Sequence, residues 1–95
     1  MAELKHHETI EEAVKYLEGL FDEQAAEAEP GDLVFRLREL VIRLLNEGEY
    51  PREVVLGSLD DYRYVLRKTG REEYEDDVQD VMDLMTGFGN SRLRI

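Results

Sequence analysis

The chain has 95 residues, of which 23 are acidic and 12 are basic, so its formal net charge is -11. A chain of this length forms one domain, with little margin for burying a core. It contains no cysteine, which excludes disulfide bonds and thiolate metal sites. No apolar run approaches the ~20 residues of a membrane helix, and the start lacks the pattern of a secretory signal. We therefore expect a cytoplasmic protein that makes no contact with a membrane.

The first predicted helix covers residues 10–28, where apolar residues recur three and four positions apart and acids such as Asp22 lie on the other side. Thr9 precedes it as a suitable N-cap, and Glu12 follows three residues later. This spacing predicts a capping box, in which the two side chains satisfy backbone N–H groups at the start of the helix. Pro30 then interrupts the helical pattern, so we expect a turn at that point.

The second helix is predicted over residues 33–47, with Asp32 as its N-cap and Gly48 as its C-terminal stop. Its main apolar face is broad, but Phe35 and Ile42 lie two turns apart on nearly the opposite side. A helix that is apolar on two faces is usually central in its bundle. Otherwise its second stripe contacts another chain, and the sequence leaves both interpretations open.

The third helix is predicted over residues 52–68, with Pro51 suited to its start. Apolar residues keep a single helical phase across Gly57 and Ser58, which favours one continuous helix. In the alternative, the helix breaks at Gly57 and Ser58 caps a new one. That break would create a helix-turn-helix motif of the kind that reads DNA.

The fourth helix is predicted over residues 71–86, with Thr69 and Glu72 as a second capping box and Gly87 at its end. Met82, Met85 and Phe88 form a hydrophobic end of this helix. Such an end is typical either of core packing or of an adaptable contact surface.

No strand pattern competes with these four segments. The sequence therefore predicts an all-α fold, a compact bundle of about four helices in which neighbours are mostly antiparallel. Residues 1–95 form one domain, and we expect residues 1–8 and 89–95 to be flexible. The C-terminal tail alternates basic and apolar residues, so it could also order on a partner.

The acidic side of the fourth predicted helix is the main candidate for function. Like charges four residues apart repel one another, so this arrangement has an energetic cost. A row of carboxylates on a helix could occupy a basic groove that normally holds a phosphate backbone, although an ordinary solvated face looks the same in sequence. The candidate partner-binding residues are Glu72, Glu73, Asp76, Asp77, Asp80 and Asp83.

A basic stripe of Arg63, Arg67 and Arg71, spaced four residues apart, precedes this acidic side. It could contact phosphates, but the excess of acids in the chain favours ion pairs with a neighbouring helix or subunit. A net charge of -11 opposes DNA binding, and Asp60 and Asp61 stand where a recognition helix would read bases. Direct binding to nucleic acid is therefore not expected.

Catalytic and metal chemistry find little support in the sequence. The two histidines, His6 and His7, are adjacent and do not share a helix face, so they are poor joint metal ligands. No histidine lies elsewhere for a Ser-His-Asp arrangement, and there is no glycine-rich phosphate loop. We expect no enzymatic activity, no cofactor and no metal.

The first functional hypothesis is an acidic protein-binding module that occludes a basic surface on a partner protein, as inhibitors, immunity proteins and phage anti-defence proteins do. The second is a structural or assembly subunit, for example of a homodimer, whose exposed apolar contacts would be Phe35 with Ile42, or Leu56 with Tyr64. The third is a helix-turn-helix DNA-binding regulator that uses the third helix.

Overall fold

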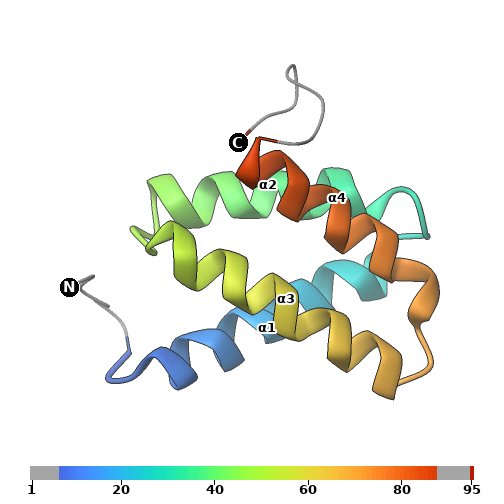
Figure 1. Ribbon diagram of the computed structural model, residues 1–95, viewed down its shortest axis with the longest axis horizontal. Coiled ribbons are helices and arrows are strands. Elements are labelled where there is room, and N and C mark those ends of the chain that lie inside the picture. The colour runs from blue at the N-terminus through green and yellow to red at the C-terminus, as the bar shows by residue number, and fades with distance from the viewer. Residues whose placement is uncertain (1–6, 88–94) are drawn as a thin grey trace.

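The computed structural model describes residues 7–87 and residue 95, and within them the predicted all-α fold is confirmed (Figure 1). The elements are α1 (Ile10–Glu27), α2 (Leu33–Asn46), α3 (Arg52–Lys68), the 3-10 helix η1 (Glu72–Tyr74) and α4 (Glu75–Thr86). Consecutive α-helices run in opposite directions, and the part of the chain that is described contains no strand.

Both α2 and α3 contact the other three α-helices, and the helix with the most extensive packing is α3. Its buried side presents Val55, Leu59, Tyr62 and Leu66, all with no exposed area. The molecule is only 19 Å thick along its shortest axis, about two helix diameters, so two layers of helices share one core. The two apolar faces of α2 are not both buried in this bundle, because Phe35 on the second face is 56% exposed.

The start of α1 is capped by side chains. The backbone N–H of Glu12 donates to the Thr9 hydroxyl oxygen at 3.1 Å, as predicted. The Glu12 carboxylate in turn accepts the N–H of Glu8, also at 3.1 Å, one residue earlier than a capping box requires. The helix ends at Glu27 with Ala28 as its C-cap, one residue before the predicted end.

Both ends of α2 differ from the prediction in their chemistry. Asp32 occupies the N-cap position, but its side chain makes no capping hydrogen bond. At the other end the left-handed residue is Glu49, with φ of 56°, and not Gly48. Gly48 is required for another reason: a Cβ there would lie 2.9 Å from the ring of Tyr50, which packs beneath the turn.

The third helix is continuous from Arg52 to Lys68, so the alternative with a break at Gly57 is wrong. Ser58 does not cap a new helix, because its hydroxyl donates to the carbonyl oxygen of Val54 in the same helix at 2.7 Å. The structural basis of the helix-turn-helix hypothesis is therefore absent.

The fourth α-helix begins at Glu75, four residues later than predicted, and η1 precedes it. Thr69 does not form the predicted capping box, since its hydroxyl donates to the carbonyl oxygen of Val65 at the end of α3. Gly70 follows with φ of 73°, and the N–H of Arg71 closes the turn onto Leu66 at 2.8 Å. The bond from Arg71 to Leu66 ends α3 in a Schellman motif. Thr69 therefore belongs to the end of α3 and does not cap the helical segment that follows.

At the end of α4, Gly87 adopts a left-handed φ of 88°, as its predicted role as a stop requires. Ile95 packs against the core, and its N–H donates to the carbonyl oxygen of Leu84 at 3.2 Å. The other residues of the predicted flexible ends, apart from His7 and Glu8, lie outside the described residues, as does Phe88.

Candidate functional site

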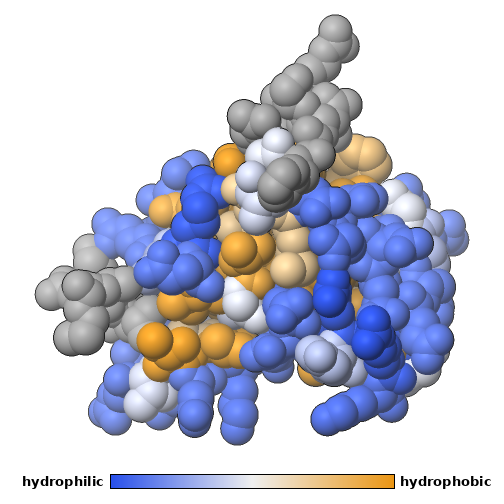
Figure 2. Space-filling view, viewed as in Figure 1, coloured by the Kyte–Doolittle hydropathy of each residue, from blue (hydrophilic) through white to orange (hydrophobic). Residues whose placement is uncertain are grey.

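Four exposed carboxylates follow the outer side of η1 and α4, and we call Glu72, Glu73, Asp76 and Asp80 the acidic row. Within the described residues, none of the four takes part in an ion pair. Figure 2 shows that hydrophilic side chains cover the right-hand side of this face, where α3 ends and α4 begins, while hydrophobic side chains gather over the middle and lower left. The acidic row is therefore solvated and carries unneutralised negative charge.

Asp77 does not belong to this exposed row. Its side chain is buried, and its two oxygens lie 3.1 and 2.9 Å from the backbone nitrogen of Gly31, which donates to them. Asp77 lies one and two turns before Val81 and Leu84, which are also buried, so it falls on the inner side of α4. Because its side chain is buried, Asp77 is not available as a contact for a partner.

Asp83 is half-buried at the edge of the row. One of its carboxylate oxygens accepts a hydrogen bond from the Gln79 amide nitrogen at 3.0 Å. The amide oxygen of Gln79 in turn accepts from Arg63 on α3. Asp83 is thus tied to the contact between α3 and α4 and is less available to a partner than the acidic row.

The pKa of Asp80 is raised above the ordinary value of 3.8. The largest cause is partial burial, followed by the negative charges of Asp77, Asp83 and Asp76. These like charges make ionised Asp80 less stable than an isolated aspartate. A cation placed against this helix would relieve part of this repulsion.

The basic stripe is paired internally, as the preferred interpretation of the sequence predicted. Arg63 lies 3.4 Å from a carboxylate oxygen of Asp60 on its own helix and also contacts Gln79 on α4. The Nε atom of Arg67 lies 2.6 Å from a carboxylate oxygen of Glu75 on α4. Arg67 through Glu75 and Arg63 through Gln79 thus connect α3 to α4.

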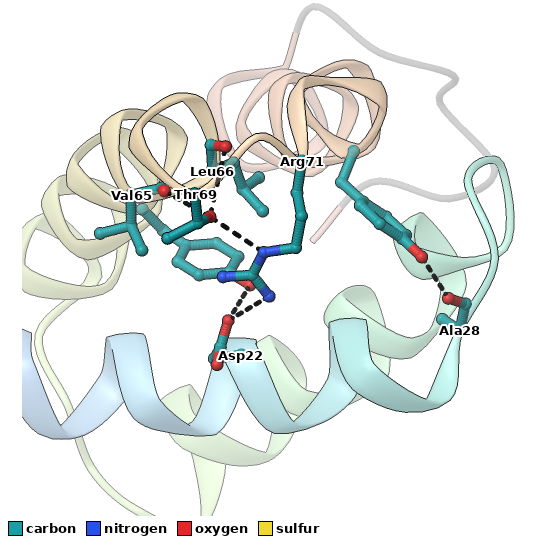
Figure 3. A network of polar contacts seen from close by, with 8 residues as sticks. Asp22, Ala28, Val65, Leu66, Thr69 and Arg71 are labelled. Atoms are coloured by element: carbon teal, nitrogen blue, oxygen red, sulfur yellow. Dashed lines mark hydrogen bonds and ion pairs between the residues drawn. The ribbon is translucent and has the colours of Figure 1, made fainter.

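Arg71 joins a network that connects α1 with the end of α3 (Figure 3). One of its terminal nitrogens lies 2.6 Å from Asp22, its Nε donates to Thr69 at 3.0 Å, and the hydroxyl of buried Tyr62 donates to the same Asp22 oxygen at 3.0 Å. Burial, and then this hydrogen bond, raises the pKa of Tyr62. Sequence spacing alone places Asp22 on the outer side of α1. A buried tyrosine hydroxyl needs a hydrogen-bond acceptor, and this requirement could have indicated an acid such as Asp22.

The four apolar interface candidates differ in exposure. Phe35 on α2 and Tyr64 on α3 are 56% and 57% exposed. Ile42 is half-buried, and half-buried Leu56 packs against the core. The guanidinium of Arg67 lies over the Tyr64 ring, 5.8 Å from its centroid. Phe35 is therefore the candidate whose ring has the least cover from its own chain.

His7 interacts with two tyrosines, Tyr16 and Tyr50. Its Nε2 lies 2.9 Å from the Tyr50 hydroxyl, and its ring centroid is 5.1 Å from that of Tyr16. His6 lies outside the described residues. Among residues 7–87 and 95, no three histidine, aspartate or glutamate side chains are grouped as metal ligands would be.

A shallow groove of about 230 Å³ lies between α1 and α3, lined by Glu11, Val14, Lys15, Glu18 and Asp61. Partial burial and then the charge of Asp61 raise the pKa of Glu18, and Lys15 opposes this. The groove is smaller than typical small-molecule sites, which measure about 300–1,000 Å³. Two of the acids that line it, Glu11 and Asp61, are exposed to solvent. It is not a credible substrate pocket.

Comparison with known proteins adds no identification: no family, curated protein or solved structure matches the chain. In the part of the chain that is described, every helix falls short of the length and apolar character that crossing a bilayer demands.

Proposed function

We propose that this protein is a small acidic binding module, which occludes a basic surface on a partner protein through the acidic row. The site it covers on the partner would be one suited to a phosphate backbone or another polyanion. Inhibitors, immunity proteins and phage anti-defence proteins work in this way. The observation that carries the proposal is the unneutralised row of Glu72, Glu73, Asp76 and Asp80 beside arginines that are already paired.

The geometry of the row suits a groove for a polyanion. Asp76 and Asp80 are four residues apart on α4, so their carboxylates are separated by about 6 Å along the helix axis. The row continues onto η1 at Glu72 and Glu73, which extends the charge by another turn. Because η1 and α4 already place these residues along one line, the backbone needs no reordering when a complementary cationic groove approaches.

Charge also favours fast association. A protein with net charge -11 attracts a basic partner at long range, and the acidic row places part of that charge on one helix. Binding should therefore weaken steeply as salt is added, mainly through a slower association rate.

The test is affinity capture from the lysate of the native host at low salt, with mass spectrometry of the retained proteins. The bait variant Asp76→Lys/Asp80→Lys reverses charge in the row, and the control Glu23→Lys/Glu47→Lys changes net charge equally at exposed positions outside it. A basic protein retained by the wild type and the control, lost from the row variant and released by high salt supports the proposal. Equal retention by all three baits contradicts it.

A further inference from the structure

The outer face of α2 carries an aromatic ring that is poorly covered by its own chain. Phe35 is 56% exposed, and Ile42, two turns later, is half-buried without packing on the described core. The opposite side of the same helix packs into the core, where Leu37, Val41 and Leu44 are buried. Phe35 is exposed on the side of α2 away from these buried residues, so the second apolar stripe faces out of the bundle. We call Phe35 and Ile42 the outer ridge.

Four exposed charged residues run beside the outer ridge and alternate in sign. Each residue turns an α-helix by about 100°, so these four lie within about 60° of one another around the helix axis. Only one of them forms an ion pair within the described residues, at 3.3 Å with Glu27 on α1, and both members of that pair are well exposed. The stripe consists of Asp32, Arg36, Glu39 and Arg43.

This stripe is complementary to itself when the helix is reversed. In an antiparallel pair related by a two-fold axis, the same flank of each helix faces its counterpart. Placing Phe35 opposite Ile42 of a second copy sets Glu39 about 3 Å along the axis from Arg36 of that copy. The same register sets Asp32 about 3 Å along the axis from Arg43 of that copy. In a parallel pair related by a two-fold axis the two stripes lie on opposite flanks and do not meet.

We propose that α2 pairs antiparallel with α2 of a second copy of this chain, through the outer ridge and the alternating stripe. The 14 residues of α2 span about 21 Å, so the contact is smaller than the ~800 Å² per partner of standard interfaces. The dimer is therefore weak, with a dissociation constant on the order of tens of micromolar or higher. This inference does not depend on the proposed acidic binding function.

Sedimentation velocity over a range of protein concentrations tests the apolar part of the contact. The wild type should shift from monomer to dimer as concentration rises, and Phe35→Ser should remain monomeric. The control is Ile10→Ser on α1, where the isoleucine is 61% exposed, and this variant should dimerise like the wild type. Circular dichroism establishes that each variant is folded.

Two charge reversals test the register. Glu39→Arg alone sets two arginines against each other across the contact, and Arg36→Glu alone sets two glutamates together, so each should weaken self-association about tenfold. An equimolar mixture restores both opposite-charge pairs, but only in the heterodimer, and should dimerise as the wild type does. A wild type that stays monomeric at millimolar concentration, a dimeric Phe35→Ser, or a mixture no stronger than its components would each overturn the proposal.

Discussion

Asp77 in α4 and Gly31 in the turn before α2 are 46 positions apart, yet both carboxylate oxygens of Asp77 lie within 3.1 Å of the Gly31 nitrogen. Gly31 has φ of 95°, a left-handed conformation that a residue with a side chain rarely adopts. A charged acceptor on α4 thus fixes the turn that orients α2. The N-cap residue Asp32 does not supply this restraint, because its side chain makes no capping bond.

Replacing Asp77 with alanine should therefore lower the free energy of unfolding by about 1.5–3 kcal/mol, the range for a hydrogen bond to a charged group. Urea denaturation measures the change. The matched control is Asp76→Ala, an exposed neighbour in the same turn, which should shift stability by no more than about 0.5 kcal/mol. Equal effects of the two substitutions would contradict the structural role of Asp77.

Gly57→Ala should stabilise the protein by about 0.5–1 kcal/mol, because glycine in a helix interior is less favourable than alanine. Gly57 lies inside continuous α3, and a Cβ placed there meets no atom within 4 Å. Thermal unfolding measures the gain. Gly31→Ala is the contrasting variant and should destabilise, because φ there is positive. Destabilisation by Gly57→Ala would indicate that α3 is broken at this position.

Tyr62→Phe should cost about 1 kcal/mol, because it removes the hydrogen bond to Asp22 while Arg71 continues to pair with that carboxylate. Because the pKa of Tyr62 is raised in the folded state, the free energy of unfolding should fall at alkaline pH. The folded protein holds this proton more tightly than the unfolded chain, so the contribution is present below the ordinary pKa of 10.0 and is lost as pH rises above it. Urea denaturation across the alkaline range should show a smaller loss of stability for Tyr62→Phe than for the wild type.

Asp80→Asn should stabilise the free protein at neutral pH. The pKa of Asp80 is raised in the folded state, so its ionised form opposes folding above that pKa, and the penalty disappears as pH falls towards the ordinary value of 3.8. The difference in melting temperature between variant and wild type should therefore be positive at neutral pH and vanish in acid. It should also shrink in high salt, because Asp80 is exposed. If the difference in melting temperature persisted unchanged in acid, the ionised Asp80 carboxylate would not be the source of the lost stability.

Much of the architecture could be predicted because helical periodicity and local caps act over a few residues. Thr9 fixed the start of α1, and the single phase of apolar residues across Gly57 indicated a continuous α3. The predicted start of α4 was too early, because Thr69 can serve either as an N-cap or at the end of a helix. In the structure it serves at the end of α3. The choice between these roles depends on Gly70 and on contacts that sequence spacing does not encode.

The candidate site was less accessible to sequence reasoning, because acidic residues look alike until burial separates them. Asp77 resembled its neighbours in the row, yet it is buried and holds a turn on another element. Asp22 resembled a solvated acid, yet it accepts from Tyr62. In both cases the deciding partner lies 40 or more positions away, beyond the range of local patterns.

The most direct test of the acidic binding function is the affinity of the captured partner, purified, for the wild type and for two charge-matched variants at several salt concentrations. We expect Asp76→Lys/Asp80→Lys to weaken binding at least about tenfold, and salt to weaken wild-type binding steeply. Glu23→Lys/Glu47→Lys should retain most of the wild-type affinity. If both variants bind equally well, or if salt leaves the wild-type affinity unchanged, then the acidic row is not the binding surface.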